Sequence, residues 1–146
     1  MDRPVVVIDT NVFVSACLGG GPANRVLRAC LSGLCKPLMG AALLAEYEDV
    51  LQRAPLWRSS PLTAVERAEL LDIFLGVCSW TRVFFTWRPN LPDEADNHLI
   101  ELAVAGNAAF IVTGNLRDLT RGELQFPGLR ALGPTDFEKE LSSWPH

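Results

Sequence analysis

The sequence predicts an α/β fold of three layers, in which helices cover both faces of a mainly parallel sheet of roughly five strands. Short apolar runs, such as VVVI at 5–8 and AAFIV at 108–112, are typical of strands that are buried on both faces. Segments with helical spacing alternate with these runs, and right-handed crossovers then place helices on both faces. With 146 residues, of which 49% are hydrophobic, the chain has the size of one domain covering residues 1–146.

The first third of the chain predicts a strand, a helix and a second strand. Residues 4–8 form the first apolar run. Residues 22–32 predict a helix, because Pro22 suits a first helical turn and Gly33 suits a helix end. Residues 35–39 predict a short strand near a sheet edge or strand end, since a proline within it removes one ladder hydrogen bond.

Two helices and a strand are predicted in the middle of the chain. Residues 41–53 place apolar side chains on one helical face and acidic side chains on the opposite face. Thr63 and Glu66 have the spacing of a capping box at the start of the next helix. We then expect a strand at 81–85, followed by a proline-containing loop at 87–95.

The last part of the chain repeats the alternation. Asp93 is suited to cap a helix at about 94–105, whose packing face carries leucine, alanine and glycine. Residues 108–113 predict a strand, and 129–132 predict a final one. A last helix is expected to begin at the Pro-Thr-Asp sequence that starts at Pro134.

Composition disfavours several classes of protein. The apolar runs are too short to cross a bilayer, and the first residues do not resemble a signal peptide, so we expect a soluble protein of the cytoplasm. A net charge of −4 disfavours a protein that coats nucleic acid, but not an enzyme that reaches a few phosphates through metal ions. The cysteines show neither C-x-x-C nor zinc-finger spacing, so we expect buried, reduced thiols at Cys17, Cys30, Cys35 and Cys78.

Oxygen-rich side chains recur at predicted strand ends and helix starts, where parallel sheets place their ligand sites. They are Asp9, Asn11, Glu46, Asp93, Asp96, Thr113 and Asn115. Hard divalent cations such as Mg²⁺ take oxygen ligands, and a cation would offset the repulsion between clustered carboxylates. Taken as a set, these residues indicate a metal site.

Taken singly, each of these residues also has a structural interpretation. Asp9 could begin an Asx turn, although a functional role is favoured at the end of a buried strand. Asp93 is better explained as a helix N-cap, and Asp96 suits the helix dipole as well as a metal site. Glu46 resembles any acid on a solvated helix face, and the polar residues on either side of Gly114 are ordinary turn residues.

Other catalytic motifs are absent from the sequence. It contains no P-loop, no dinucleotide-binding glycine motif, no H-E-x-x-H and no G-x-S-x-G. His98 is the serious candidate for histidine acid–base catalysis, but its position on the polar side of its helix predicts a solvated side chain. The four tryptophans lie outside the strands named above and are expected to fill the core or an interface.

Three stretches together resemble the PIN domain family. They are VVIDTNVFVSA at 6–16, the acidic helix around Glu46, and DEADNHLIELAVAGNAAFIVTGN at 93–115 with the LRDL that follows. The combination of D-x-x-D-N with a downstream I-V-T-G-N is the specific part, and the likeness runs from about residue 4 to residue 137. Within the family, the chain is similar to the VapC-like ribonucleases, the toxins of toxin–antitoxin pairs.

The resemblance implies a role for each matching residue. Asp9, Glu46 and Asp96 correspond to the family's first three metal-binding acids. The usual fourth acid falls on Asn115, whose amide oxygen can coordinate a metal ion but brings no charge. Asn11 and Thr113 are implied to orient ligands or water, with Asp93 and Asp118 as helpers. From their positions, Arg25, Arg28, Arg117 and Arg121 are candidates for contact with RNA phosphates, although an ordinary surface role is favoured for such arginines.

The implied function is hydrolysis of RNA phosphodiester bonds by an endoribonuclease that uses Mg²⁺ or Mn²⁺ to activate water and stabilise charge on the phosphate. The resemblance also implies a cognate antitoxin and a homodimer. One alternative keeps the fold without catalysis, as a binding or assembly module, because Asn115 lacks the fourth charge. A phosphatase with an aspartyl nucleophile is disfavoured, because it needs a second aspartate where the chain has Asn11.

Overall fold

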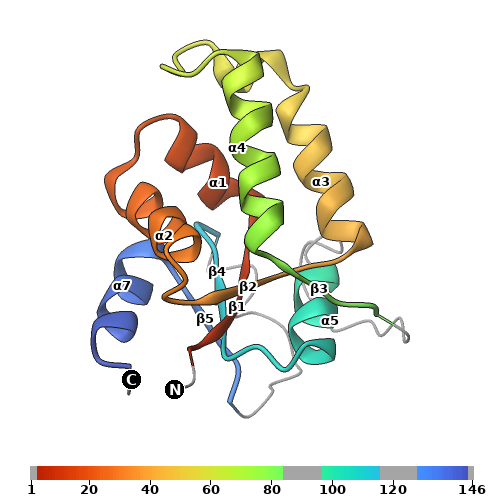
Figure 1. Ribbon diagram of the computed structural model, residues 1–146, viewed down its shortest axis with the longest axis vertical. Coiled ribbons are helices and arrows are strands. Elements are labelled where there is room, and N and C mark those ends of the chain that lie inside the picture. The colour runs from red at the N-terminus through yellow and green to blue at the C-terminus, as the bar shows by residue number, and fades with distance from the viewer. Residues whose placement is uncertain (1–2, 84–96, 116–127, 145–146) are drawn as a thin grey trace.

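The computed structural model describes residues 3–83, 97–115 and 128–144 (Figure 1). Its strands are β1 (Val5–Ile8), β2 (Lys36–Met39), β3 (Ser79–Trp80), β4 (Phe110–Val112) and β5 (Arg130–Leu132). Its helices are α1 (Thr10–Cys17), α2 (Gly21–Leu31), α3 (Ala41–Leu51), α4 (Ala64–Val77), α5 (Asn97–Ala105) and α7 (Pro134–Ser142), with a short 3₁₀ helix at Ala54–Trp57. None of the helices in these ranges is long and apolar enough to cross a lipid bilayer.

The strands in the described ranges form a five-stranded parallel sheet in the order β3-β2-β1-β4-β5. β1 lies at the centre, and its last residue, Ile8, is paired with Val112 at the end of β4. The chain moves outward from β1 through β2 to β3, and then crosses back to β4 on the other side of β1. Connections therefore leave β1 and β4 in opposite directions, which is where open parallel sheets form a crevice.

Crossovers between parallel strands are right-handed. The connections that run from β1 to β3 and the connection that returns from β3 to β4 therefore place helices on opposite faces of the sheet. On one face α2 packs against α1, α4 and α7. α5 contacts β1, β2 and β4, and in Figure 1 it lies apart from α1 and α2. This arrangement confirms the predicted three-layer α/β fold with a parallel sheet.

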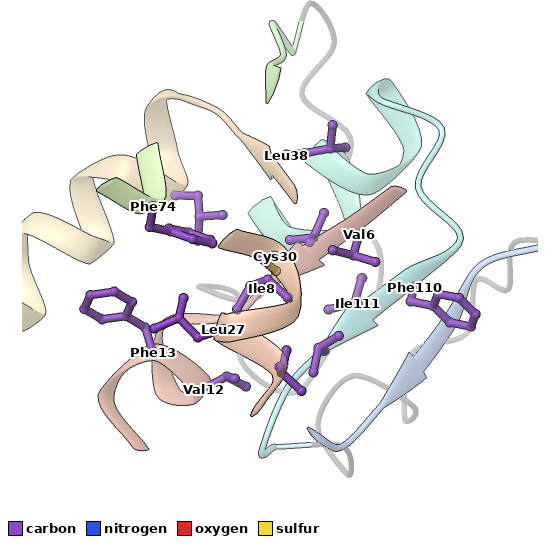
Figure 2. Close-up of a cluster of buried hydrophobic side chains, with 14 of the residues drawn as sticks. Val6, Ile8, Val12, Phe13, Leu27, Cys30, Leu38, Phe74, Phe110 and Ile111 are labelled. Carbon is purple, nitrogen blue, oxygen red and sulfur yellow. The ribbon is translucent and has the colours of Figure 1, made fainter. Parts of the chain in front are cut away.

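The main core lies between the sheet and the helices of the first face. Figure 2 shows side chains of β1 and β4, among them Val6, Ile8 and Phe110, on the side of the sheet where α1, α2 and α4 contribute Val12, Phe13, Leu27 and Phe74. Further along the sheet, the ring of Phe110 packs edge-on against Phe137 and Trp144, with centroids 5.6 Å away in each case. The apolar strand runs are thus buried on both faces, as their sequences predict.

An aromatic cluster holds α3 against the carboxyl end of β1. The ring centroids of Phe13, Tyr47 and Phe74 lie between 5.3 and 6.2 Å apart. The fully buried Tyr47 hydroxyl donates a hydrogen bond to the Ile8 carbonyl over 2.7 Å, and burial raises its pKa well above the usual value. Because Tyr47 follows Glu46 and Ile8 precedes Asp9, this bond fixes the two acids relative to each other.

Most predicted elements are confirmed, with bounds that differ by a few residues. These are the strands at 4–8, 35–39, 108–113 and 129–132, and the helices at 22–32, at 41–53 and after Pro134. The capping box is present, since the Glu66 N–H donates to Thr63 Oγ1 over 3.1 Å and the Thr63 N–H donates to Glu66 Oε1 over 2.8 Å. The helix expected at 94–105 is seen from Asn97 onward, and its expected cap, Asp93, lies outside the described residues.

Two features of the structure differ from the predictions. Helix α1 was not expected, because its sequence is rich in β-branched residues, and its N-cap Asp9 with the first two helical residues, Thr10 and Asn11, resembles a polar turn. The strand expected at 81–85 is wrong for residues 81–83, and 84–85 lie outside the described residues, as does the loop expected at 87–95. β3 pairs only as far as Trp80 because its partner β2 ends at Met39, opposite Trp80.

The four cysteines are free thiols, as expected. Cys17, Cys30 and Cys35 are buried, and Cys78 is half-buried. Burial raises the pKa of Cys17 to about 11 and that of Cys78 to about 12, so both remain protonated at neutral pH.

We expect Tyr47→Phe to lower the free energy of unfolding by about 1–2 kcal/mol, because the buried Ile8 carbonyl loses its hydroxyl donor while the ring packing is kept. Urea denaturation measures the change. Ser143→Ala is the control, since it removes an exposed hydroxyl that bonds only carbonyls of the last helical turn. Equal stability of the two variants would contradict a structural role for the Tyr47 hydroxyl.

Candidate active site

The carboxyl ends of β1 and β4 place two polar residues side by side in the crevice of the sheet. Asp9 follows β1 and Thr113 follows β4. The Asp9 N–H donates to the Val112 carbonyl over 3.0 Å, so the ladder between the strands extends to this point. Both side chains are buried, with exposed fractions of 5% for Asp9 and 0% for Thr113.

The Asp9 carboxylate is held by side chains and is not used to cap α1. Asp9 occupies the N-cap position of α1 in an extended conformation, but its side chain forms no capping hydrogen bond. Its Oδ2 instead accepts hydrogen bonds from Thr113 Oγ1 over 2.8 Å and from Asn11 Nδ2 over 3.1 Å. The simple turn interpretation of Asp9 therefore does not describe its contacts.

Thr113 and Asn11 link the two strand ends through a small network. Thr113 Oγ1 accepts from the Asn115 N–H over 3.0 Å while it donates to Asp9. Asn11 Oδ1 accepts from the Gly114 N–H over 2.9 Å. Asn11, Thr113 and the backbone of Asn115, all predicted for the site, thus lie in one hydrogen-bond network with Asp9.

Helix α3 brings Glu46 to the same edge. The Thr10 hydroxyl lies between the two acids, 3.0 Å from Glu46 Oε1 and 3.4 Å from Asp9 Oδ1. A hydroxyl has one proton, and the shorter distance favours donation to Glu46. Thr10 was not predicted as a site residue, although its position between Asp9 and Asn11 is a signal that could have identified it.

His98, in the first turn of α5, contacts Glu46 from the other side. Its Nε2 lies 2.6 Å from Glu46 Oε2, and its side chain is only 19% exposed. The prediction that His98 is solvated is therefore wrong. Its buried Nδ1 has no hydrogen-bond partner within the described part of the chain. No sequence pattern indicates this contact, because the two residues lie 52 positions apart on different helices.

The two carboxyl groups are perturbed in opposite directions. Burial is the largest cause that raises the pKa of Asp9, and the nearby Glu46 charge raises it further, while the Thr113 hydrogen bond opposes the change. The pKa of Glu46 is lowered, chiefly by its hydrogen bond with His98 and also by Thr10, against the effect of burial. In the folded protein, ionisation of the carboxyl group is therefore unfavourable for Asp9 and favourable for Glu46.

This donor set suits a hard divalent cation. Asp9 and Glu46 supply carboxylate oxygens on either side of one hydroxyl, and Mg²⁺ is commonly held by one or two carboxylates together with waters and substrate phosphates. Positive charge here would offset the cost of ionising Asp9. Among the described residues, no three histidine, cysteine or acidic side chains form a group that could hold a metal ion. A third acidic ligand would therefore have to come from another part of the chain.

Several predicted site residues fall outside the described ranges, and two others lie on α2. Those outside the described ranges are Asp93, Asp96, Arg117, Asp118 and Arg121. Arg25, on α2, forms an ion pair with Glu138 of α7, with Nε and Oε2 2.7 Å apart. Arg28 is exposed on the same helix. The proposed phosphate contacts of the arginines remain predictions.

Comparisons with known proteins agree with this fold. A family model described as PIN domain matches residues 5–117. The fold is similar to a solved structure of VapBC2 from Rickettsia felis bound to a DNA fragment from its promoter, with a TM-score of 0.57 and 17% sequence identity. That similarity covers 88% of this chain and 98% of the matched one. No curated protein sequence matches the chain.

Opposite effects on stability are expected when the two acids are neutralised in metal-free protein. Because the pKa of Asp9 is raised above 3.8, its ionised form costs the folded state free energy above the folded pKa, and the cost disappears below 3.8. Asp9→Asn should therefore raise the thermal midpoint by a few degrees at neutral pH. The amide can keep the hydrogen bonds, accepting from Thr113 and donating to Thr10.

Glu46→Gln should lower the midpoint at neutral pH. Because the pKa of Glu46 is lowered below 4.5, its contribution is complete above 4.5 and is lost as the pH falls through the lowered value. Thermal unfolding in EDTA from neutral pH to about pH 3 measures both variants. Both differences should shrink at low pH, and destabilisation by Asp9→Asn as large as that by Glu46→Gln would contradict the assignment.

Proposed function

The chain belongs to the PIN domain family, and we propose that it is a divalent-metal-dependent endoribonuclease whose acidic residues are Asp9, Glu46 and Asp96. The observation that carries this proposal is the convergence of Asp9 and Glu46 on the Thr10 hydroxyl at the crevice between β1 and β4. A buried carboxylate next to a second one, with a raised pKa, is typical of a functional site.

The residues of the site divide into ligands and the groups that orient them. Asp9 and Glu46, together with Asp96 and the amide oxygen of Asn115, would hold Mg²⁺ or Mn²⁺. The chemistry that such a cation supplies is activation of water and stabilisation of charge on the scissile phosphate. Thr113 and Asn11 restrict the Asp9 carboxylate to one orientation. Asp93 and Asp118 are proposed to assist, as the resemblance implies.

Helix α1 and helix α5 together fix the orientation of Glu46, which lies on α3. Thr10 binds one of its oxygens and His98 binds the other, so the carboxylate is restrained on both sides. Ligands restrained in this way lose little conformational freedom when a cation or substrate binds. This restraint supports a preformed site at the edge of the sheet.

RNA is the proposed substrate, and a protein antitoxin is the proposed partner. With a net charge of −4, the chain has few cations for general phosphate contacts, so we expect recognition of unpaired RNA segments by shape. Arg25, Arg28, Arg117 and Arg121 are the candidates for the contacts that remain. The solved structure with a similar fold is of VapBC2 on promoter DNA, which supports a toxin in complex with its antitoxin. We also propose a homodimer located in the cytoplasm.

A binding or assembly module without catalysis is the second candidate. The observation that favours it is that both Glu46 oxygens already have protein partners, Thr10 on Oε1 and His98 on Oε2. A carboxylate satisfied in this way is stable without a cation. Such a module would show no metal binding that depends on Asp9.

We expect the wild-type protein to bind Mn²⁺ and to cleave single-stranded RNA only in the presence of Mg²⁺ or Mn²⁺. Asp9→Asn and Asp96→Asn should each reduce the cleavage rate by more than about 100-fold, because they remove charged ligands. Calorimetric titration with Mn²⁺ and cleavage of total cellular RNA measure the two effects. The matched control is Glu69→Gln, an exposed acid on α4, which should leave both unchanged.

The outcomes separate the two candidates. If Asp9→Asn and Asp96→Asn still cleave RNA at the wild-type rate, the proposed nuclease mechanism is wrong. Absence of Mn²⁺ binding by folded wild-type protein would support the binding module. A rise in thermal stability on addition of Mn²⁺ that is lost in Asp9→Asn would support the metal site without reference to RNA.

Thr113→Val should weaken Mn²⁺ binding and cleavage by about 10- to 100-fold, because the Asp9 carboxylate loses its shortest hydrogen bond while the side-chain shape is kept. Thr113→Ser keeps the hydroxyl and should stay close to wild type. Titration calorimetry and initial cleavage rates test this pair. Equal loss in both variants would show that the methyl group, and not the hydroxyl, is what matters at this position.

A further inference from the structure

A cavity of about 570 Å³ opens beside the acidic site, and of its lining residues only His98 has a role in the site proposed above. Its walls are the start of α3 (Gly40–Leu43), the chain that leaves β3, and the first turns of α5. Its size is typical of small-molecule sites. We infer that this cavity binds one unpaired guanine base of the RNA next to the scissile phosphate, an inference that rests on the proposed nuclease function.

His98 connects the cavity to the acidic site. It lines the cavity, and its Nε2 lies 2.6 Å from Glu46 Oε2. A nucleotide whose phosphate lies at the Asp9 and Glu46 carboxylates can therefore reach the cavity with an adjacent base. A site for a base at this position would set the register of the RNA relative to the acids.

Trp80 gives the cavity a surface for base stacking. It is the last residue of the edge strand β3, and its side chain is 56% exposed, in contrast to the buried Trp57. Within the described ranges its indole stacks on no other aromatic ring. An exposed indole at a cavity wall is a common platform for an unpaired base. Of the two roles expected for the tryptophans, filling the core or an interface, the first does not apply to Trp80.

Charged groups on the cavity wall match the edges of guanine. Glu101, half-buried on α5, provides a carboxylate that only accepts hydrogen bonds, and Arg82 provides a cation that only donates them. Neither forms an ion pair with another residue in the described part of the chain. Guanine offers N1–H and N2–H₂ donors to a carboxylate, and O6 and N7 acceptors to an arginine. Adenine, cytosine and uracil lack this pair of adjacent donors.

Binding of labelled uridine hexamers, with or without one guanine, tests the inference by fluorescence anisotropy in EDTA, where no divalent cation is present for cleavage. We expect the guanine-containing hexamer to bind wild-type protein about 10-fold more tightly than the all-uridine one. Trp80→Ala should weaken binding of the guanine-containing hexamer by about 10-fold, whereas Trp80→Phe should keep most of it. Glu101→Gln should remove the preference for guanine.

Ile73→Ala and Glu69→Gln are the matched controls, since both residues are exposed on α4, away from the cavity. No guanine preference, or equal binding by wild type and Trp80→Ala, would overturn the inference. A change in oligomeric state of Trp80→Ala by light scattering, with RNA binding unchanged, would identify the surface as a contact between copies of the chain. If the protein prefers guanine but shows no metal-dependent cleavage, the cavity assignment stands and the proposed nuclease function is wrong. If it cleaves RNA in a metal-dependent way but shows no preference for guanine, the nuclease function stands and the cavity assignment is wrong.

Discussion

The geometry of the site depends on one hydrogen bond, from the Tyr47 hydroxyl to the Ile8 carbonyl. The bond joins α3 to the end of β1, and each partner is the chain neighbour of one acidic residue. Phe13 and Phe74 pack around the Tyr47 ring and keep water away from the bond, which strengthens it in a surrounding of low dielectric constant. The distance between Asp9 and Glu46 is therefore set by the core and not by the acids themselves, which repel each other.

The acidic site carries a cost that the rest of the fold must offset. Burial and the charge of Glu46 both oppose ionisation of Asp9, and the Thr113 hydroxyl only partly compensates. A fourth carboxylate at position 115 would add negative charge at the same edge. Asn115 instead has an uncharged amide oxygen that can act as a metal ligand, and its backbone N–H donates a hydrogen bond to Thr113 Oγ1. The amide thus lowers the repulsion between acidic groups in the metal-free protein, and in the proposed metal site it would leave less negative charge for a second cation.

The sequence predicts the central parts of the fold well because they rest on local patterns. Buried runs such as 5–8 and the Thr63–Glu66 capping box depend on neighbouring residues only. Helix α1 was missed because its β-branched residues favour a strand, and packing against α2 and α3 overrides that preference. The contact between His98 and Glu46 could not be predicted, because it depends on how α3 and α5 meet at the sheet edge. The same holds for the Thr10 hydroxyl between the two acids.

The acidic site and the cavity beside it have a common structural origin at Gly40. β2 ends at Met39 and α3 begins at Ala41, so Glu46 is brought back over the sheet edge within two helical turns. The same early start of α3 leaves β3 without a strand partner beyond Trp80, and the chain departs from the sheet with that indole exposed. A side chain at position 40 would place its Cβ 3.1 Å from the Thr81 carbonyl oxygen and 3.2 Å from Leu102 Cδ1. Glycine therefore permits a close junction of β2, α3 and α5, and that junction places an acid on one side of His98 and a cavity on the other.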